Sequence, residues 1–130
     1  MKISGTFEAI LKPLDSYVAG QQGVTLARMS IDKTFRGELE AVSTGEMLGA
    51  MTSVGVSAGY VAIEQVMGSL SGKKGSFVLQ HFGTMAEGEN RLVLEVVPGS
   101  GSDELKGLSG EMAIGIEDEE HFYDFDYDLP

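Results

Sequence analysis

Glu64 and His81 are the two side chains whose types and setting best suit proton transfer. Each lies in a segment rich in β-branched and aromatic residues, Glu64 in Tyr60–Leu70 and His81 in Gly75–Met85. A carboxylate beside an imidazole among apolar side chains can act as a general acid–base pair, because burial raises the pKa of the acid and the partner's charge lowers it. A structural histidine with satisfied hydrogen bonds is the alternative interpretation of the same pair.

The turn between the two segments decides whether these side chains meet. The Gly- and Lys-rich stretch that joins the segments predicts a tight hairpin turn. With Lys73 and Lys74 as the central turn residues, Val66 lies opposite His81, and Glu64 is a diagonal neighbour of His81 on the same face. A register shift of one residue would place the two side chains on opposite faces.

The pattern of Gly75–Met85 predicts a strand that is covered on both sides. With a period of two, one face carries Phe77, Leu79, His81, Gly83 and Met85, and the other carries Ser76, Val78, Gln80, Phe82 and Thr84. Both faces are largely apolar, so we expect the interior of a barrel on one side and a partner subunit or a crossing segment on the other. The pattern of Tyr60–Leu70 also suits a short helix, but its β-branched residues favour a strand.

The rest of the chain is typical of strands with short connections. We expect strands at Lys2–Leu11, Val24–Phe35, Glu38–Leu48, Arg91–Val97, Glu111–Glu117 and His121–Leu129, with Pro13 ending the first, and one helical turn at Ser102–Leu108 capped by Ser102. About eight antiparallel strands can close into a barrel or stack as a sandwich, and closure into a barrel removes exposed strand edges. The sequence thus predicts one all-β domain over residues 1–130, an eight-stranded closed barrel with room inside for side chains or one small ligand.

Composition and charge argue against several classes of protein. The 130 residues suit one domain with one core, and they include no Cys and two His, so we expect no metal site and no cofactor. A net charge of −11 disfavours nucleic acid and anionic membranes as partners. The N-terminal residues show no signal segment, and no apolar run is long enough to span a membrane, so we expect a cytoplasmic protein.

Three other motifs have better structural explanations. Gly55–Gly59 matches the nucleophile-elbow pattern, with Asp103 and His121 following in hydrolase order, but an elbow needs the strand, turn and helix of a large α/β sheet. Pro98–Gly101 precedes a helical turn as phosphate loops do, yet it lacks their third Gly and their Lys. Asp124–Asp128 alternates acidic and aromatic residues as a solvated strand face does, without the Gly and Glu of a calcium loop.

Several strings along the chain resemble those of a family of small bacterial proteins known only as a domain of unknown function. They are Lys33–Phe35, Tyr60–Glu64, Gly75–Met85, Val97–Gly101, Leu105–Gly110 and His121–Tyr127. The resemblance covers nearly the whole chain and implies a calycin-like β-barrel similar to allene oxide cyclase, with an apolar cavity and self-association. It brings no activity, because none is assigned to the family and the active-site pattern of the cyclase is missing here. The polar groups to which it points are Tyr60, Glu64, Gln80, His81, His121 and Tyr123.

Three functions are compatible with these observations. The first is a barrel that binds a small, mostly apolar molecule oriented by Glu64, Gln80 and His81, with Tyr60, His121 and Tyr123 as further ligand-binding groups. The second is an isomerase or cyclase in which Glu64 and His81 move a proton. The third is a ligand-free protein whose apolar outer strands pair subunits into a dimer or trimer.

Overall fold

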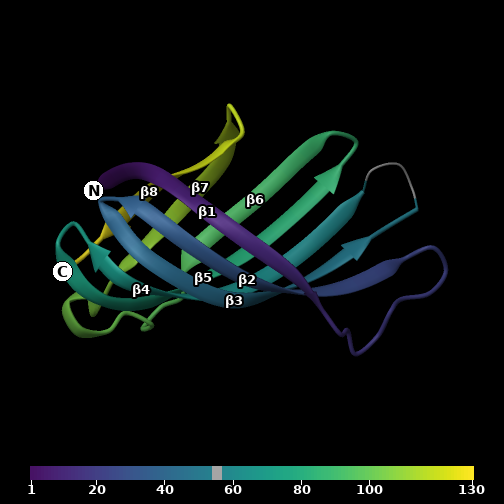
Figure 1. Ribbon diagram of the computed structural model, residues 1–130, viewed down its shortest axis with the longest axis horizontal. Helices are drawn as coiled ribbons and strands as arrows, with labels where there is room; N and C mark the ends of the chain where they lie inside the picture. Colours follow the sequence, from purple (N-terminus) through teal and green to yellow (C-terminus); the bar gives the residue numbers. More distant parts are fainter. Residues whose placement is uncertain (54–56) are drawn as a thin grey trace.

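Eight β-strands and one 3-10 turn make up the regular structure in the computed structural model, which describes residues 1–53 and 57–130. The elements are β1 (Lys2–Leu14), β2 (Thr25–Gly37), β3 (Leu39–Met51), β4 (Ala58–Leu70), β5 (Lys73–Ala86), β6 (Glu89–Val96), η1 (Asp103–Leu105), β7 (Ser109–Glu117) and β8 (Glu120–Asp128). Each strand pairs antiparallel with the next, and β1 also pairs with β8, so the sheet closes into a barrel (Figure 1). The predicted all-β, eight-stranded antiparallel barrel is confirmed. Within the described residues, no helix is long and apolar enough to cross a membrane.

The hairpin between β4 and β5 turns two residues earlier than predicted, at Ser71 and Gly72. Both residues have positive φ, 48° and 85°, as in a type I′ turn, and Gly accepts this conformation far more readily than Lys does. Val66 consequently pairs with Phe77, a register shift of four residues. Because four is an even number, every side chain keeps its predicted face.

The barrel interior is packed at one end and open at the other. The packed end holds both termini and the loop that carries η1 (Figure 1). The largest buried side chains there include Phe35, Phe77, Tyr123, Phe125 and Tyr127. The open end is formed by the β5–β6 hairpin and the adjoining ends of β1 to β4 (Figure 1).

Two local predictions are wrong. Pro13 does not end the first strand, which continues beyond it with Pro13 opposite Met29. Since β8 pairs only with Lys2–Phe7, this part of β1 is an edge strand, where Pro is tolerated. Ser102 makes no side-chain cap for η1; its hydroxyl accepts the backbone N–H of Ser76 at 2.9 Å and so fastens the η1 loop to β5.

The seam between β6 and β7 is where the barrel closes least completely. Two residue pairs join these strands, Leu94 with Met112 and Glu95 with Glu111. Toward the open end, the β7–β8 hairpin leaves the side of β6 (Figure 1). The inward-facing Leu92 of β6 is therefore 40% exposed, and the interior is accessible from this end.

Candidate functional site

Among the described residues, four polar or charged side chains are buried inside the barrel, each contributed by a different strand. They are Lys33 of β2, Ser43 of β3, Glu64 of β4 and His81 of β5. All four occupy inward-facing positions of their strands, between the packed end and the open end. Four neighbouring strands thus bring together side chains that are up to 48 residues apart in the sequence.

Glu64 is the centre of this cluster and is completely buried. Its Oε1 accepts a hydrogen bond from Ser43 Oγ at 2.6 Å, and its Oε2 accepts one from Lys33 Nζ at 2.8 Å. The same Oε2 is also hydrogen-bonded to Nε2 of His81, so the predicted contact between Glu64 and His81 is present. Within the described residues, every buried side-chain nitrogen and oxygen has a hydrogen-bond partner.

Two glycines make the space that the site side chains occupy. Gly45 of β3 pairs with Glu64, and a Cβ at this position would lie 2.0 Å from the carbonyl oxygen of Ile63. Gly83 of β5 pairs with Tyr60, and a Cβ there would lie 2.4 Å from the Tyr60 ring. The strands therefore approach each other at Gly45, and the Tyr60 ring packs directly on the backbone at Gly83.

The electrostatics of the cluster keep Glu64 ionised. Burial raises the pKa of Glu64, but the hydrogen bond from His81 and the positive charge of Lys33 together outweigh it, and the pKa falls from 4.5 to about 2. The Lys33 ammonium also lies over the rings of Phe7 and Phe35, 5.1 and 5.8 Å from their centroids. At neutral pH the carboxylate is a fixed negative charge paired with Lys33, and it does not serve as an acid.

Tyr60 connects the buried cluster to the open end of the barrel. Its hydroxyl lies 3.4 Å from Nδ1 of His81. Burial, together with the negative charge of Glu64, raises the pKa of the Tyr60 phenol, so the phenol stays protonated at neutral pH. A hydrogen-bonded path consequently runs from Tyr60 through His81 and Glu64 to Lys33.

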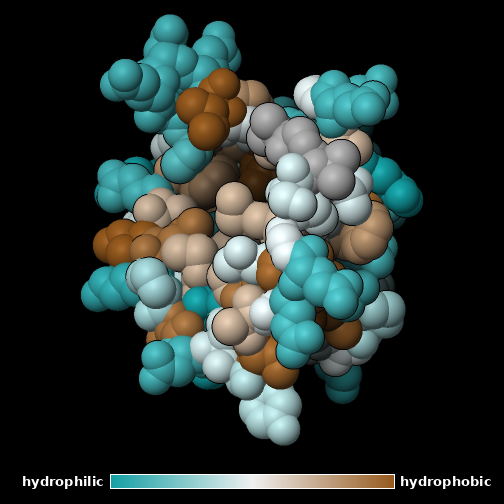
Figure 2. All heavy atoms as spheres, turned by 90° about the vertical axis from the view of Figure 1, so that its right-hand side faces the viewer, coloured by the Kyte–Doolittle hydropathy of each residue, from teal (hydrophilic) through white to brown (hydrophobic). Residues whose placement is uncertain are grey.

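An apolar cavity of about 360 Å³ lies at the open end, with Tyr60 among its walls. Its inward-facing lining consists mainly of Ala27, Met29, Met47, Gly49, Met51, Ala58, Tyr60, Gly83, Met85 and Leu92. Figure 2, which faces this end, shows a hollow with apolar side chains in its depth and hydrophilic side chains around it. The cavity thus offers an apolar surface with the phenol of Tyr60 as its link to the buried cluster.

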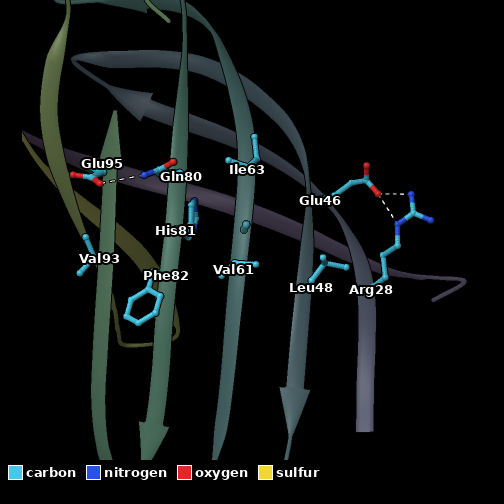
Figure 3. A pocket seen from close by; sticks show the side chains of 11 residues that line it. Arg28, Glu46, Leu48, Val61, Ile63, Gln80, His81, Phe82, Val93 and Glu95 are labelled. Atoms are coloured by element: carbon cyan, nitrogen blue, oxygen red, sulfur yellow. Dashed lines mark hydrogen bonds and ion pairs between the residues drawn. The ribbon is translucent and has the colours of Figure 1, made fainter. Parts of the chain in front are cut away.

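Gln80 does not face the interior, so the predicted role of its side chain in orienting a ligand inside the barrel is wrong. Successive residues of a strand point to opposite faces, so Gln80 is exposed on the outer face, where its amide donates to Glu95 at 3.1 Å (Figure 3). It lies in an outer groove of about 740 Å³ that crosses β2 to β6. The groove has a mainly apolar centre, which includes Leu48, Val61, Ile63 and Phe82 (Figure 3).

His121 and Tyr123 lie apart from the buried cluster. The hydroxyl of Tyr123 accepts the backbone N–H of Leu39 at 3.2 Å and donates to the carbonyl of Arg36 at 3.0 Å. These bonds fasten the β2–β3 turn to β8 and are structural. His121 stacks on Phe7 with 5.1 Å between ring centroids. Neither residue lines the cavity at the open end.

Lys33 and Ser43 belong to the cluster, although the sequence did not single them out as candidates. The signal for Lys33 was its position on the otherwise apolar face of Val24–Phe35, since a charge on such a face needs a buried partner. For the elbow-like motif, Gly55 and Val56 lie outside the described residues, and the motif ends in β4, a strand where an elbow requires a helix. In the part of the chain that the structure describes, no group of three His, Asp or Glu side chains is placed to hold a metal ion.

Fold and site together define a closed eight-stranded antiparallel barrel with a buried Lys–Glu–His cluster beneath an apolar opening. Residues 3–127 match a family model described as a protein of unknown function, DUF3224, and the chain belongs to this family. A crystal structure of a DUF3224 protein of unknown function from Shewanella oneidensis MR-1 is 60% identical in sequence, with a TM-score of 0.97 over 100% of this chain and 97% of that one. The comparison with curated proteins gives no match. The family resemblance seen in the sequence is confirmed.

Proposed function

We propose that the barrel binds a small, mostly apolar molecule in the cavity at its open end. The observation that carries this proposal is the cavity of about 360 Å³, which is lined by methionines and other apolar side chains and has the Tyr60 phenol in its wall. Its volume lies within the range of roughly 300–1,000 Å³ found for ligand sites. Apolar walls contribute affinity by burial, and a single hydroxyl contributes orientation.

The buried cluster supports this function by positioning Tyr60. An ion pair inside a barrel costs desolvation free energy that apolar side chains would avoid. Glu64, which is paired with Lys33, is hydrogen-bonded to the ring of His81, and Nδ1 of His81 in turn lies within hydrogen-bonding distance of the hydroxyl of Tyr60, a residue of the cavity wall. In this proposal Tyr60 touches the ligand, and Glu64, His81 and Lys33 are positioning residues.

Filling the cavity is expected to weaken binding. Gly49 faces the interior opposite Tyr60, and a Cβ there makes only ordinary contacts, at 3.7 Å and beyond. Gly49→Leu should therefore fold and lower the affinity for 2-methylnaphthalene at least about tenfold, or about 1.4 kcal/mol, in a fluorescence titration. Thr44→Leu adds a similar side chain to the outer face of the same strand and should leave the affinity unchanged. Equal affinities in Gly49→Leu and the wild type would refute the cavity as the binding site.

A catalytic version of the site is the second candidate, an isomerase or cyclase that moves a proton. The observation that favours it is the path from Tyr60 through His81 to Glu64, which matches the order of nucleophile or acid, base and orienting carboxylate in general acid–base sites. The low pKa of Glu64 assigns the proton transfer to Tyr60 and His81, with Glu64 orienting the imidazole. If Tyr60→Phe turns over a substrate at the same rate as the wild type, this version is excluded.

The outer groove supports a further proposal, self-association with a second copy of this chain. Leu48, Val61, Ile63 and Phe82 form an apolar face on neighbouring strands, although each is between 43% and 56% exposed, and such faces mark interaction sites. The flanking Arg28 is paired with Glu46 at 2.6 Å. A copy that carries the same net charge of −11 therefore meets less repulsion here than at the acidic strands.

Ile63→Glu is expected to break this association, because it places a charge at the centre of the apolar face. Light scattering should give a dimer or trimer for the wild type and 13.8 kDa, the mass of one chain, for Ile63→Glu. Ile116→Glu changes an exposed isoleucine outside the groove and should keep the wild-type mass. A monomeric wild type would remove the proposal.

The cytoplasmic location expected from the sequence stays a prediction.

A further inference from the structure

We propose that the molecule bound at the open end carries a hydroxyl group, as a small phenol or alcohol does, and that this hydroxyl donates a hydrogen bond to the oxygen of Tyr60. The inference rests on the proposed binding function and names the polar group of the ligand. It follows from the positions of the protons along the path from Glu64 to Tyr60.

The first step fixes the proton on the inner nitrogen of His81. An ionised carboxylate only accepts hydrogen bonds, and Glu64 is ionised because its pKa is about 2. Each partner of Glu64 must therefore donate. Ser43 donates its hydroxyl proton, Lys33 donates from its ammonium, and His81 donates from Nε2.

The second step leaves Nδ1 of His81 without a proton. The charge of Glu64 is already balanced by Lys33, 2.8 Å away, in a buried site. A second cation on His81 would leave a net positive charge among apolar side chains, which is costly. The neutral imidazole has one N–H, which is at Nε2, so its Nδ1 is an acceptor.

The third step concerns the hydroxyl of Tyr60. With Nδ1 of His81 as acceptor at 3.4 Å, the Tyr60 proton points to His81 and is not available to a ligand. The phenol stays neutral because burial and the nearby Glu64 raise its pKa. Its oxygen has lone pairs left, and none of the described residues donates a hydrogen bond to it. A ligand hydroxyl can satisfy this oxygen, whereas a ketone or ether would place two acceptors against each other.

A carboxylic acid fits this site less well than an alcohol or phenol. The buried cation nearest to Tyr60 along the path is Lys33, and its charge is taken up by Glu64. Arg91 also lines the cavity, but it projects from the outer face of β6, where its guanidinium lies 5.1 Å from the centroid of the Phe82 ring. The Lys33 charge is therefore not free to balance an anionic group at the Tyr60 oxygen, and none of the described residues places a cation in hydrogen-bonding contact with that oxygen.

The test compares three naphthalenes that differ in one substituent, in the wild type and in Tyr60→Phe. We expect 2-naphthol to lose about tenfold in affinity in Tyr60→Phe, the value of one hydrogen bond. The affinities for 2-methylnaphthalene, which has no polar group, and for 2-acetonaphthone, which only accepts, should stay within about twofold. Unchanged binding of 2-methylnaphthalene also shows that Tyr60→Phe is folded.

The outcomes separate this inference from the proposed function. If 2-methylnaphthalene binds but Tyr60→Phe and the wild type have the same affinity for 2-naphthol, the hydroxyl preference is overturned and the cavity is still the binding site. If Tyr60→Phe instead lowers the affinity for 2-acetonaphthone, Tyr60 donates a hydrogen bond to the ligand, and the proton arrangement is the reverse of the one proposed. If the wild type binds none of the three probes, the proposed function fails and the inference fails with it.

Discussion

Glu64→Gln is expected to lower the free energy of unfolding by about 3–5 kcal/mol, the cost of leaving a buried charge without its partner. The amide has nearly the shape of the carboxylate but cannot balance the Lys33 ammonium 2.8 Å away. It also turns one of the two acceptor oxygens into a donor, facing side chains that all donate to Glu64. The loss therefore combines an unpaired buried cation with an unsatisfied hydrogen bond.

Urea unfolding at neutral pH measures this loss, and Glu46→Gln is the matched control. Glu46 is paired with Arg28 on the outer face and is more than half exposed, so its replacement should cost about 0–1 kcal/mol. Adding Lys33→Met to Glu64→Gln should recover much of the loss, because no buried charge then remains. A loss in Glu64→Gln no larger than in the control would show that the cluster is not held by charge.

Acid is expected to remove the contribution of the same carboxylate. The pKa of Glu64 in the folded protein, about 2, is below its usual value of 4.5. A depressed pKa stabilises the folded state fully above pH 4.5, and the stabilisation is lost as the pH falls toward 2. Its size is about 3 kcal/mol, from the difference between the two pKa values.

Unfolding measured at several pH values, in the wild type and in Glu64→Gln, isolates this contribution from the other acidic residues. The gap between the two stability curves should be constant above pH 5 and should narrow below pH 4.5, because protonated Glu64 resembles Gln. A gap that stays constant down to pH 2.5 would contradict the lowered pKa. The comparison uses only the difference between the curves, so the many exposed carboxylates cancel.

The strand order and the faces could be predicted from the sequence, because a period of two is a local property. Alternation placed His81 inside and made Glu64 its neighbour, and both assignments survived a register shift of four residues. The turn at Ser71 and Gly72 could have been recognised from the need for positive φ at both positions. The same alternation placed Gln80 on the face opposite His81, so Gln80 should not have been expected to orient a ligand inside the barrel.

The full composition of the cluster could not be predicted from local patterns. Lys33 and Ser43 reach Glu64 only because β2, β3 and β4 are consecutive neighbours in the sheet, and the register of each pair decides which side chains meet. The cavity at the open end depends on glycines whose missing side chains leave room for a neighbouring strand or an aromatic ring, as Gly83 does for the ring of Tyr60. Their effect appears only once the barrel is closed.

Methionine methyl resonances test most directly whether the open end of the barrel is a binding site. Of the seven methionines, Met29, Met47, Met51 and Met85 line the cavity, whereas Met1, Met67 and Met112 do not. Addition of 2-methylnaphthalene to wild-type protein with ¹³C-labelled methionine methyl groups should shift the first four resonances and leave the other three unchanged. Shifts confined to Met67, on the outer face of β4, or no shifts at any methionine would contradict binding in the cavity.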